Sequence, residues 1–213
     1  MEALYSWLPA GIQAILVWLT RVTGSAGVGI ILLTILIRLA LYPLTKKQTE
    51  SMIAMRELQP KLKALQEKYK NKPEEYQKRL IELYKAEGVN PLGGCLPILI
   101  QIPFLFALFY VLRSFSFEGV DPTFLIWDLT KTDPYYILPI LSGVTTYLQS
   151  LMTLTDPSQK MFLYIMPVFI TWISVSFPVG LVLYWVTSNI FSIGQQYWLS
   201  RTMPNAKGGA STK

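Results

Sequence analysis

Arg38 has the strongest chemical implication in this sequence, because it lies inside an apolar stretch, 30–44, that is long enough to enter a lipid bilayer. It is the only formal charge in any stretch that we predict to cross a membrane. A charged side chain in such a place marks a functional-site hypothesis. The alternative is structural. Lys46 follows eight residues later, about 12 Å along a helix, so Arg38 can also extend its guanidinium toward the membrane surface.

The energy of membrane insertion leaves both roles of Arg38 open. An arginine at the centre of a helix costs about 2.5–3.5 kcal/mol on insertion scales, whereas each Leu, Ile, Val or Phe contributes about 0.3–0.6 kcal/mol in favour. The predicted segment, 24–44, holds eleven Leu, Ile or Val residues. The segment can therefore insert with its arginine.

Hydroxyl and amide side chains in other apolar stretches are candidate neighbours of Arg38. Thr34 lies one turn before it on the same helical face. The others are Gln101 in a second stretch, Ser142, Thr145 and Gln149 at i, i+3, i+7 spacing in a third, and Tyr184, Ser188 and Gln195 in the last. Each of them alone can serve hydrogen bonding between helices. Together, and without a charge to pair Arg38, they favour a water-filled recess. A recess of this kind suits the transient binding of a polar or acidic stretch of another polypeptide.

The composition indicates an integral membrane protein. The 213 residues are 52% hydrophobic and only 15% charged, whereas soluble domains are about 25% charged. Histidine is absent and Cys95 is the single cysteine, which excludes an internal disulfide, a His/Cys zinc site and every Ser-His or Cys-His nucleophile pair. No acidic residue lies in a predicted span, so we expect no Asp/Glu proton relay, and we predict no cofactor.

The elements that position these side chains are all helical. We predict an all-α membrane protein with five transmembrane helices that form a hydrophilic groove in the inner leaflet. The predicted spans are 24–44, 91–112, 136–154, 161–173 and 181–199. The segments between and around them are an N-terminal interfacial amphipathic helix at 1–23, a cytoplasmic antiparallel helical hairpin at 45–90, an extracytoplasmic loop at 113–135, a short cytoplasmic loop at 155–160, a short extracytoplasmic turn at 174–180 and a basic cytoplasmic tail at 200–213. For 1–23, a degraded signal anchor is the alternative.

The basic residues determine the predicted orientation. With the 45–90 hairpin inside, fifteen Lys and Arg residues lie on the inner side and three on the outer side. The positive-inside rule then places the N-terminus outside and the C-terminus in the cytoplasm. Most of the net charge of +6 is therefore explained by the basic residues that set the predicted membrane orientation. The hairpin can still contact anionic lipid head groups or RNA, although we predict no specific nucleic-acid partner.

A series of motifs resembles one family, the YidC/Oxa/Alb membrane protein insertases. They occur in family order between about residues 28 and 199, and the series is far more specific than any single motif. The matching stretches are 34–45, 58–60, 83–85, 89–97, 101–103, 166–167, 177–185, 188–189 and 195–196.

The resemblance implies a five-helix insertase core, without enzymatic chemistry, whose groove opens to the cytoplasm and to lipid and is closed toward the outside. Arg38 matches the groove arginine of the family, and Thr34 and Trp185 match positions that contact substrate segments. The 45–90 hairpin matches a mobile cytoplasmic element needed for activity. The implied function is insertion and chaperoning of nascent membrane proteins. The implied partners are the lipid bilayer, the Sec translocon, the ribosome and the signal recognition particle pathway.

Some features depart from the family pattern. We expect a minimal bacterial form in the plasma membrane, because no large extracytoplasmic domain precedes the first span and no transit peptide is evident. The short tail argues against ribosome docking through a long basic C-terminus. Cys95 matches a residue of the second-span motif, where we expect it to pack and not to carry a lipid anchor.

Two other functional classes are disfavoured. A small-solute transporter or channel typically has ionisable pairs or internal repeats across its spans, and neither is present. A membrane-embedded enzyme lacks a catalytic constellation here, and Gly93-Gly94 lacks the lysine spacing of a phosphate-binding loop.

Overall fold

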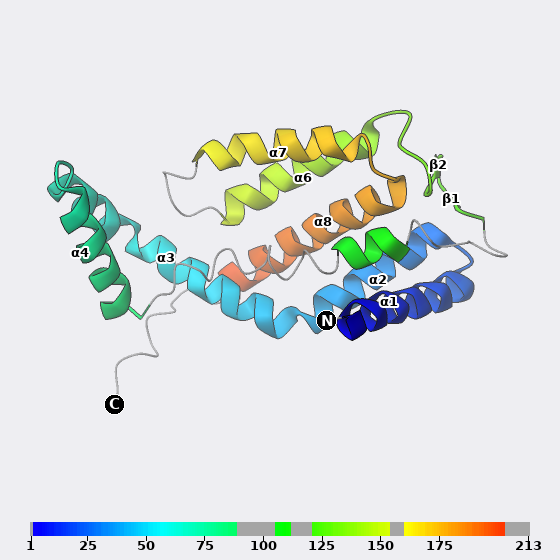
Figure 1. Cartoon of the computed structure of the whole chain (residues 1–213), viewed down its shortest axis with the longest axis horizontal. Coiled ribbons are helices and arrows are strands. Elements are labelled where there is room, and N and C mark those ends of the chain that lie inside the picture. Colours follow the sequence, from blue (N-terminus) through cyan, green and yellow to red (C-terminus); the bar gives the residue numbers. More distant parts are fainter. Residues whose placement is uncertain (1, 89–104, 112–120, 154–159, 203–213) are drawn as a thin grey trace.

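The computed structural model describes residues 2–88, 105–111, 121–153 and 160–202, most of which are helical (Figure 1). The helices are α1 (Glu2–Thr23), α2 (Ala26–Ala40), α3 (Tyr42–Lys68), α4 (Pro73–Ala86), α6 (Ile137–Thr153), α7 (Lys160–Ser174) and α8 (Val179–Thr202). Residues 105–111 form a further helical segment, and β1 (Thr123–Phe124) pairs with β2 (Trp127–Asp128). The all-helical prediction is confirmed. Most of the predicted 91–112 span lies outside the described residues.

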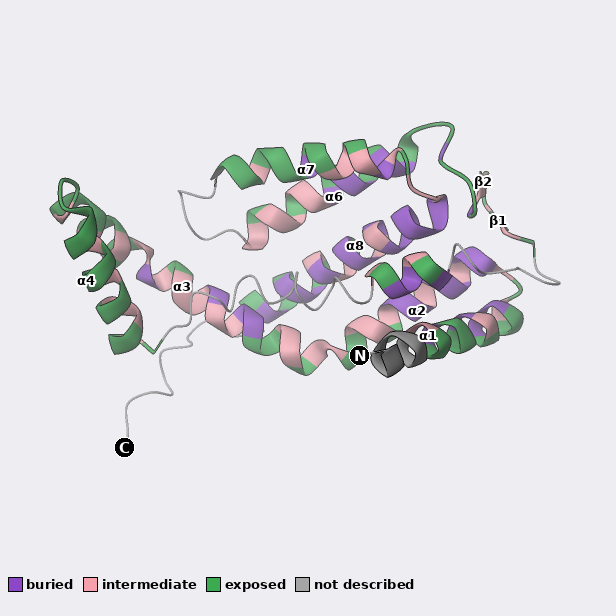
Figure 2. Ribbon diagram, viewed as in Figure 1, coloured by how far each residue is buried: buried purple, intermediate pink, exposed green. Residues whose placement is uncertain are grey.

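Helix α8 lies at the centre of the bundle, with α2 on one side and α6 and α7 on the other (Figure 1). Thirteen of its residues are buried, and their buried apolar members join those of α1 and α2 in one core (Figure 2). Helix α3 leads away from this bundle to α4, in which no residue is fully buried. Two regions of the chain thus differ in burial: a packed bundle and a largely exposed helix pair.

A tight joint places α1 along α2. Gly24 has a φ of +68°, a left-handed conformation that glycine adopts without steric cost, and the next residue, Ser25, is the N-cap of α2. Gly29 permits the close approach of the two helices, because a Cβ there would lie 2.7 Å from the hydroxyl of Thr20. The chain is helical at Glu2–Thr23, and the interfacial position that we predict for this segment stays a prediction. This helix packs its buried residues Ile12 and Leu16 into the core.

The chain bends by 64° between α2 and α3. Pro43 sits in the first turn of α3, where its missing N–H is tolerated, but the same residue cannot continue the hydrogen-bond ladder of α2. The predicted 24–44 segment is consequently divided: its last three residues, 42–44, belong to α3. Pro60 lies inside α3 without ending it, and α4 begins at Pro73 as its proline and first-turn glutamates predicted.

No single helix in the described ranges is long and apolar enough to cross a membrane by itself. The bent pair of α2 and α3 meets both criteria when it is taken together, and Met161–Ser174 is a shorter apolar helix. Helices α6 and α7 have only 17 and 15 residues, and α8 carries many hydroxyl and amide side chains. The number of spans, the groove and the cytoplasmic hairpin therefore stay predictions.

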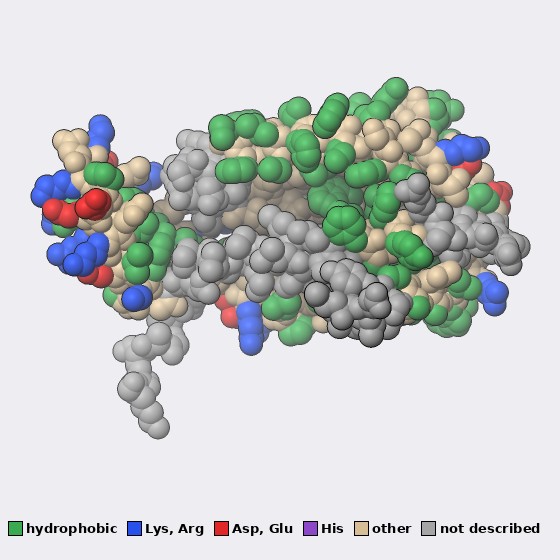
Figure 3. All heavy atoms as spheres, in the orientation of Figure 1, with side chains coloured by type: hydrophobic (Ala, Val, Ile, Leu, Met, Phe, Trp, Pro, Cys, Tyr) green, Lys and Arg blue, Asp and Glu red, His purple; other side chains and the backbone are tan. Residues whose placement is uncertain are grey.

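Helix α7 presents a large apolar surface to its surroundings (Figure 3). Its large apolar side chains that are at least 44% exposed are Met161, Phe162, Tyr164, Ile165, Val168, Phe169 and Trp172. A continuous exposed surface of this kind is unusual for a protein in water. On its other side α7 packs closely on α6. Gly143 permits this contact, because a Cβ at that position would lie only 1.9 Å from the hydroxyl oxygen of Thr171.

The loop before α6 closes one end of the bundle. Asp133 is 4% exposed, and its carboxylate accepts hydrogen bonds from Trp127 Nε1 at 2.8 Å, the Tyr135 amide at 2.9 Å and the Leu138 amide at 2.8 Å. It thereby caps the first turn of α6. The loop also satisfies the start of α8: the amide of Val179 donates to the Lys131 carbonyl at 2.8 Å, and that of Gly180 donates to the Leu129 carbonyl at 3.0 Å.

Candidate substrate site around Arg38

Arg38 lies in the last turn of α2, half-buried against α8. Its Nε donates a hydrogen bond of 2.9 Å to Ser188 Oγ, and its Nη2 donates to the same oxygen. The structure thus joins two of the predicted site residues across 150 positions of sequence. A neutral hydroxyl orients the guanidinium and leaves its positive charge in place, so an acidic group can still be attracted to it.

Two further predicted residues lie next to this pair. Tyr184, one turn before Ser188 on α8, is 2% exposed and lies close enough to the Arg38 guanidinium to interact with it electrostatically. Thr34, one turn before Arg38 on α2, is fully buried, and its hydroxyl donates to the Ile30 carbonyl of its own helix at 2.7 Å. Thr34 is therefore buried one turn from Arg38, and its hydroxyl is already hydrogen-bonded within α2.

A second polar face of α8 contacts α6. Trp185 Nε1 donates to Thr146 Oγ1 at 3.1 Å, and Asn189 Nδ2 donates to the hydroxyls of Thr145 at 3.1 Å and Thr146 at 3.0 Å. Thr145 and Trp185 were both predicted for the groove, and here they belong to this second network. Asn189 and Thr146 were not among the predicted site residues, although each is adjacent in sequence to one that was.

The other predicted residues lie away from Arg38 or outside the described residues. The Ser142 hydroxyl is fully buried between α6 and α7, where it donates to the Pro139 carbonyl at 2.7 Å and contacts the Ser174 hydroxyl at 3.1 Å. Gln149 is half-buried on α6. Gln101 lies outside the described residues. Spacing on one helix therefore identified the face of α6, but it did not indicate that this face meets α7 and α8.

The far end of α8 holds polar groups that the sequence pattern only partly indicated. Gln196 Nε2 donates to the Met152 carbonyl at 3.0 Å, and the same carbonyl accepts from the guanidinium of Arg56 on α3. One carbonyl in the last turn of α6 therefore connects three helices. Beside it, the buried side chains of Ser192 and Gln195 have no hydrogen-bond partner within the described part of the chain.

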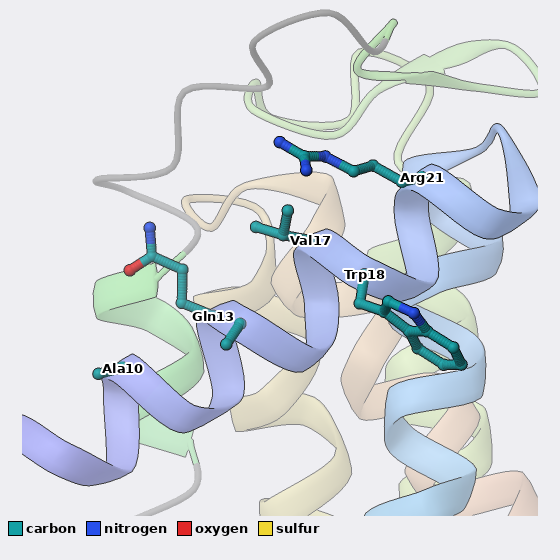
Figure 4. Close-up of a pocket in the computed structure, with 6 residues that line it drawn as sticks. Ala10, Gln13, Val17, Trp18 and Arg21 are labelled. Atoms are coloured by element: carbon teal, nitrogen blue, oxygen red, sulfur yellow. The ribbon is translucent and has the colours of Figure 1, made fainter.

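A separate shallow hollow lies on α1 and contains none of these residues. It is lined by Ala10, Gln13, Ala14, Val17, Trp18 and Arg21. Figure 4 shows that Val17 and Arg21 project from the same side of α1, whereas Trp18 turns away from them. No group of three or more Cys, Asp or Glu side chains in the described ranges is arranged to hold a metal ion.

Comparison with known proteins identifies the family. The model of the 60Kd inner membrane protein family matches residues 18–207. The chain belongs to this family. The family resemblance carried by the motifs is therefore confirmed.

Named relatives agree with this assignment. The chain is 44% identical over 200 residues to a membrane protein insertase YidC of Wolinella succinogenes, covering 92% of this chain and 37% of that protein. It is 53% identical over 175 residues to a protein of the same name from Blochmanniella floridana, covering 80% of this chain and 31% of that protein.

A solved structure has a similar fold. It is described as an active YidC insertase crystal structure with the first transmembrane domain resolved, and it matches with a TM-score of 0.75 at 35% identity, covering 91% of this chain and 46% of that one. The chain spans less than half the length of each of these relatives.

Proposed function

We propose that the chain forms the inserting core of a membrane protein insertase and chaperone in the bacterial inner membrane. In this role it takes hydrophobic segments of nascent proteins from the cytoplasm into the bilayer, alone or with the Sec translocon, and without covalent chemistry. The observation that carries the proposal is the Arg38 guanidinium, which the Ser188 hydroxyl holds half-buried between α2 and α8. The family assignment and the names of the relatives support it.

The proposed topology has five spans with the N-terminus outside and the C-terminus in the cytoplasm. The spans correspond to α2 with the start of α3, to residues 91–112, and to α6, α7 and α8. Helices α3 and α4 then form the cytoplasmic hairpin, and the loop around Asp133 closes the outer end. The exposed apolar surface of α7 supports a lipid-facing position for that helix. The ribosome and the signal recognition particle pathway are proposed as suppliers of substrate.

The proposed mechanism uses one fixed charge. A polar or acidic segment that enters between α2 and α8 gains the attraction of Arg38, and the half-buried position of this residue makes the Coulombic interaction stronger than in bulk water. The same segment then crosses only the remaining part of the bilayer. The Nε and Nη2 of Arg38 both donate to the one hydroxyl of Ser188. A lysine at this position therefore keeps the charge but loses the second donor.

Reconstitution tests the proposal. The full chain in liposomes receives a small newly synthesised membrane protein whose translocated segment carries acidic residues, and the protease-protected fraction is measured. We expect protection above that of protein-free liposomes. Arg38→Ala should lower it about tenfold, corresponding to the loss of about 1.4 kcal/mol of a charge-assisted interaction, and Arg38→Lys should have an intermediate effect. Arg201→Ala is the control, since Arg201 lies at the exposed end of α8, against the Tyr197 ring.

Two outcomes count against different parts of the proposal. Protection no greater than in protein-free liposomes refutes the insertase function. An Arg38→Ala variant that performs like the wild type refutes only the role of the charge. Solute flux through the same liposomes, measured with an entrapped dye, would favour the alternative of a channel or transporter.

A further inference from the structure

Ser192 and Gln195 are buried polar residues whose side chains have unused hydrogen-bonding capacity. Gln195 is 9% exposed and Ser192 is 7% exposed. Within the described ranges, neither Nε2 nor Oε1 of Gln195 has a hydrogen-bond partner, and neither does the Oγ of Ser192. Burying such groups without partners is unfavourable, and nearly all buried polar groups in proteins are paired. Retaining three unpaired atoms within one helical turn therefore suggests an external partner.

The position of these residues links them to Arg38. Ser188, Ser192 and Gln195 follow i, i+4, i+7 spacing and so share one face of α8. Gln195 lies about 10 Å along the helix axis from Ser188, toward the end of α8 that approaches α3. The adjacent Gln196 points to α6, where its amide is satisfied by the Met152 carbonyl. The two neighbouring glutamines thus have different surroundings: one is bonded within the protein, and the other is not.

The chemistry of the unpaired atoms matches a peptide backbone. A glutamine amide offers donors and an acceptor together, and a serine hydroxyl can act as either. A main-chain peptide group presents the complementary N–H and C=O. An anionic ligand is matched less well, because no basic side chain shares this face of α8 beyond Ser188.

We propose that Ser192 and Gln195 form a second subsite that binds the main chain of the incoming polypeptide. The inference rests on the proposed insertase function and adds a division of labour to it. Arg38 selects for acidic side chains, whereas the Ser192–Gln195 subsite binds non-helical backbone of any sequence before it reaches the arginine. A backbone segment there supplies the hydrogen bonds that the protein itself does not.

Stability and activity should change in opposite directions when the subsite is removed. Gln195→Leu keeps the approximate volume and eliminates the unpaired amide, so we expect a higher unfolding midpoint in detergent. The same change should slow insertion about tenfold, the effect of losing one or two hydrogen bonds to the substrate. Gln196→Leu is the matched comparison, and its midpoint should fall because the bond to Met152 is lost.

The proposed subsite also predicts how the loss depends on the substrate. The Gln195→Leu defect should be equal for substrates with acidic and with neutral translocated segments, whereas the Arg38→Ala defect should be larger for the acidic one. A photoreactive residue at position 195 should give adducts with the arrested substrate, and one at position 196 should give adducts only within the chain.

Two results would overturn the inference while leaving the insertase function intact: a more stable Gln195→Leu variant that inserts as fast as the wild type, or a less stable one, which would mean that the amide already has a partner in the protein. Failure of the wild-type chain to insert any substrate would instead overturn the proposed function.

Discussion

Gly143 offers a sharp test of the packing between α6 and α7. A Cβ at this position would lie 1.9 Å from Thr171 Oγ1 and 3.0 Å from the Pro167 carbonyl oxygen. The Thr171 side chain cannot simply rotate away, because its hydroxyl donates to that same carbonyl at 2.9 Å and its β-branching restricts χ1. We therefore expect Gly143→Ala to force the two helices apart or to break the hydrogen bond.

The expected magnitude follows from two opposing contributions. Alanine in place of glycine inside a helix is favourable by about 0.8–1.0 kcal/mol. Overpacking costs about 1–3 kcal/mol, and loss of the Thr171 hydrogen bond costs about 1 kcal/mol more. We expect Gly143→Ala to lower the free energy of unfolding by about 1–3 kcal/mol. Gly194→Ala on α8 is the control, since no side chain or other helix of the described ranges comes within 4 Å of the place that a Cβ would take there, and this change should instead be neutral or stabilising by up to about 1 kcal/mol.

The assay is denaturant-induced unfolding in a mild detergent, followed by tryptophan fluorescence. A double variant adds a second check: with Thr171→Ala in place, the nearest obstruction is removed, and Gly143→Ala should become much less destabilising. Equal stability of the Gly143→Ala and Gly194→Ala variants, or an unchanged effect in the Thr171→Ala background, would contradict the close approach of α6 and α7.

Two further predictions concern the loop before α6, which closes one end of the bundle. Asp133→Asn should lower stability by about 1.5–3 kcal/mol, because a neutral amide oxygen replaces a carboxylate that accepts three hydrogen bonds; an unchanged unfolding midpoint would refute this. Hydrogen bonds from the Thr130 hydroxyl and from Lys131 lower the pKa of Asp128 to about 2. Because that pKa lies below the value of about 3.9 in the unfolded chain, ionised Asp128 stabilises the fold above pH ~4, and this stabilisation is lost as the pH falls toward 2. Solvent screening limits this change in the free energy of unfolding to less than about 1 kcal/mol. Asp128→Asn should abolish it between about pH 4 and pH 2.

The sequence predicted individual helices well, because their signals are local. Pro73 with Glu74 and Glu75 correctly indicated the start of α4. Helices α6, α7 and α8 begin and end within three residues of the segments predicted from apolar length and flanking polar residues, while their role as spans stays a prediction. The end of α2 was misplaced because composition alone does not reveal that Pro43 starts a new helix at 64° to the old one.

The site was less accessible to sequence reasoning, since it depends on which helix faces which. The pairing of Arg38 with Ser188 agrees with the polar faces recognised in the sequence. Helical spacing could not show that Trp185 and Asn189 turn toward the threonines of α6. The unpaired state of Ser192 and Gln195 is likewise a property of the assembled bundle.

The amides of Val179 and Gly180 bond the first turn of α8 to the loop carbonyls, whereas the far end of α8 is held by a side-chain hydrogen bond from Gln196 to the Met152 carbonyl. A 24-residue helix is about 36 Å long, so any tilt of α8 about its first turn gives a displacement that grows along the helix. A tilt of about 5° would move Ser188 by about 1 Å, Gln195 by about 2 Å and the far end of α8 by about 3 Å. In the proposed insertase, a tilt of this kind would widen the end of α8 nearest α3 more than the end bonded to the loop, so that a chain would enter the bundle from one side.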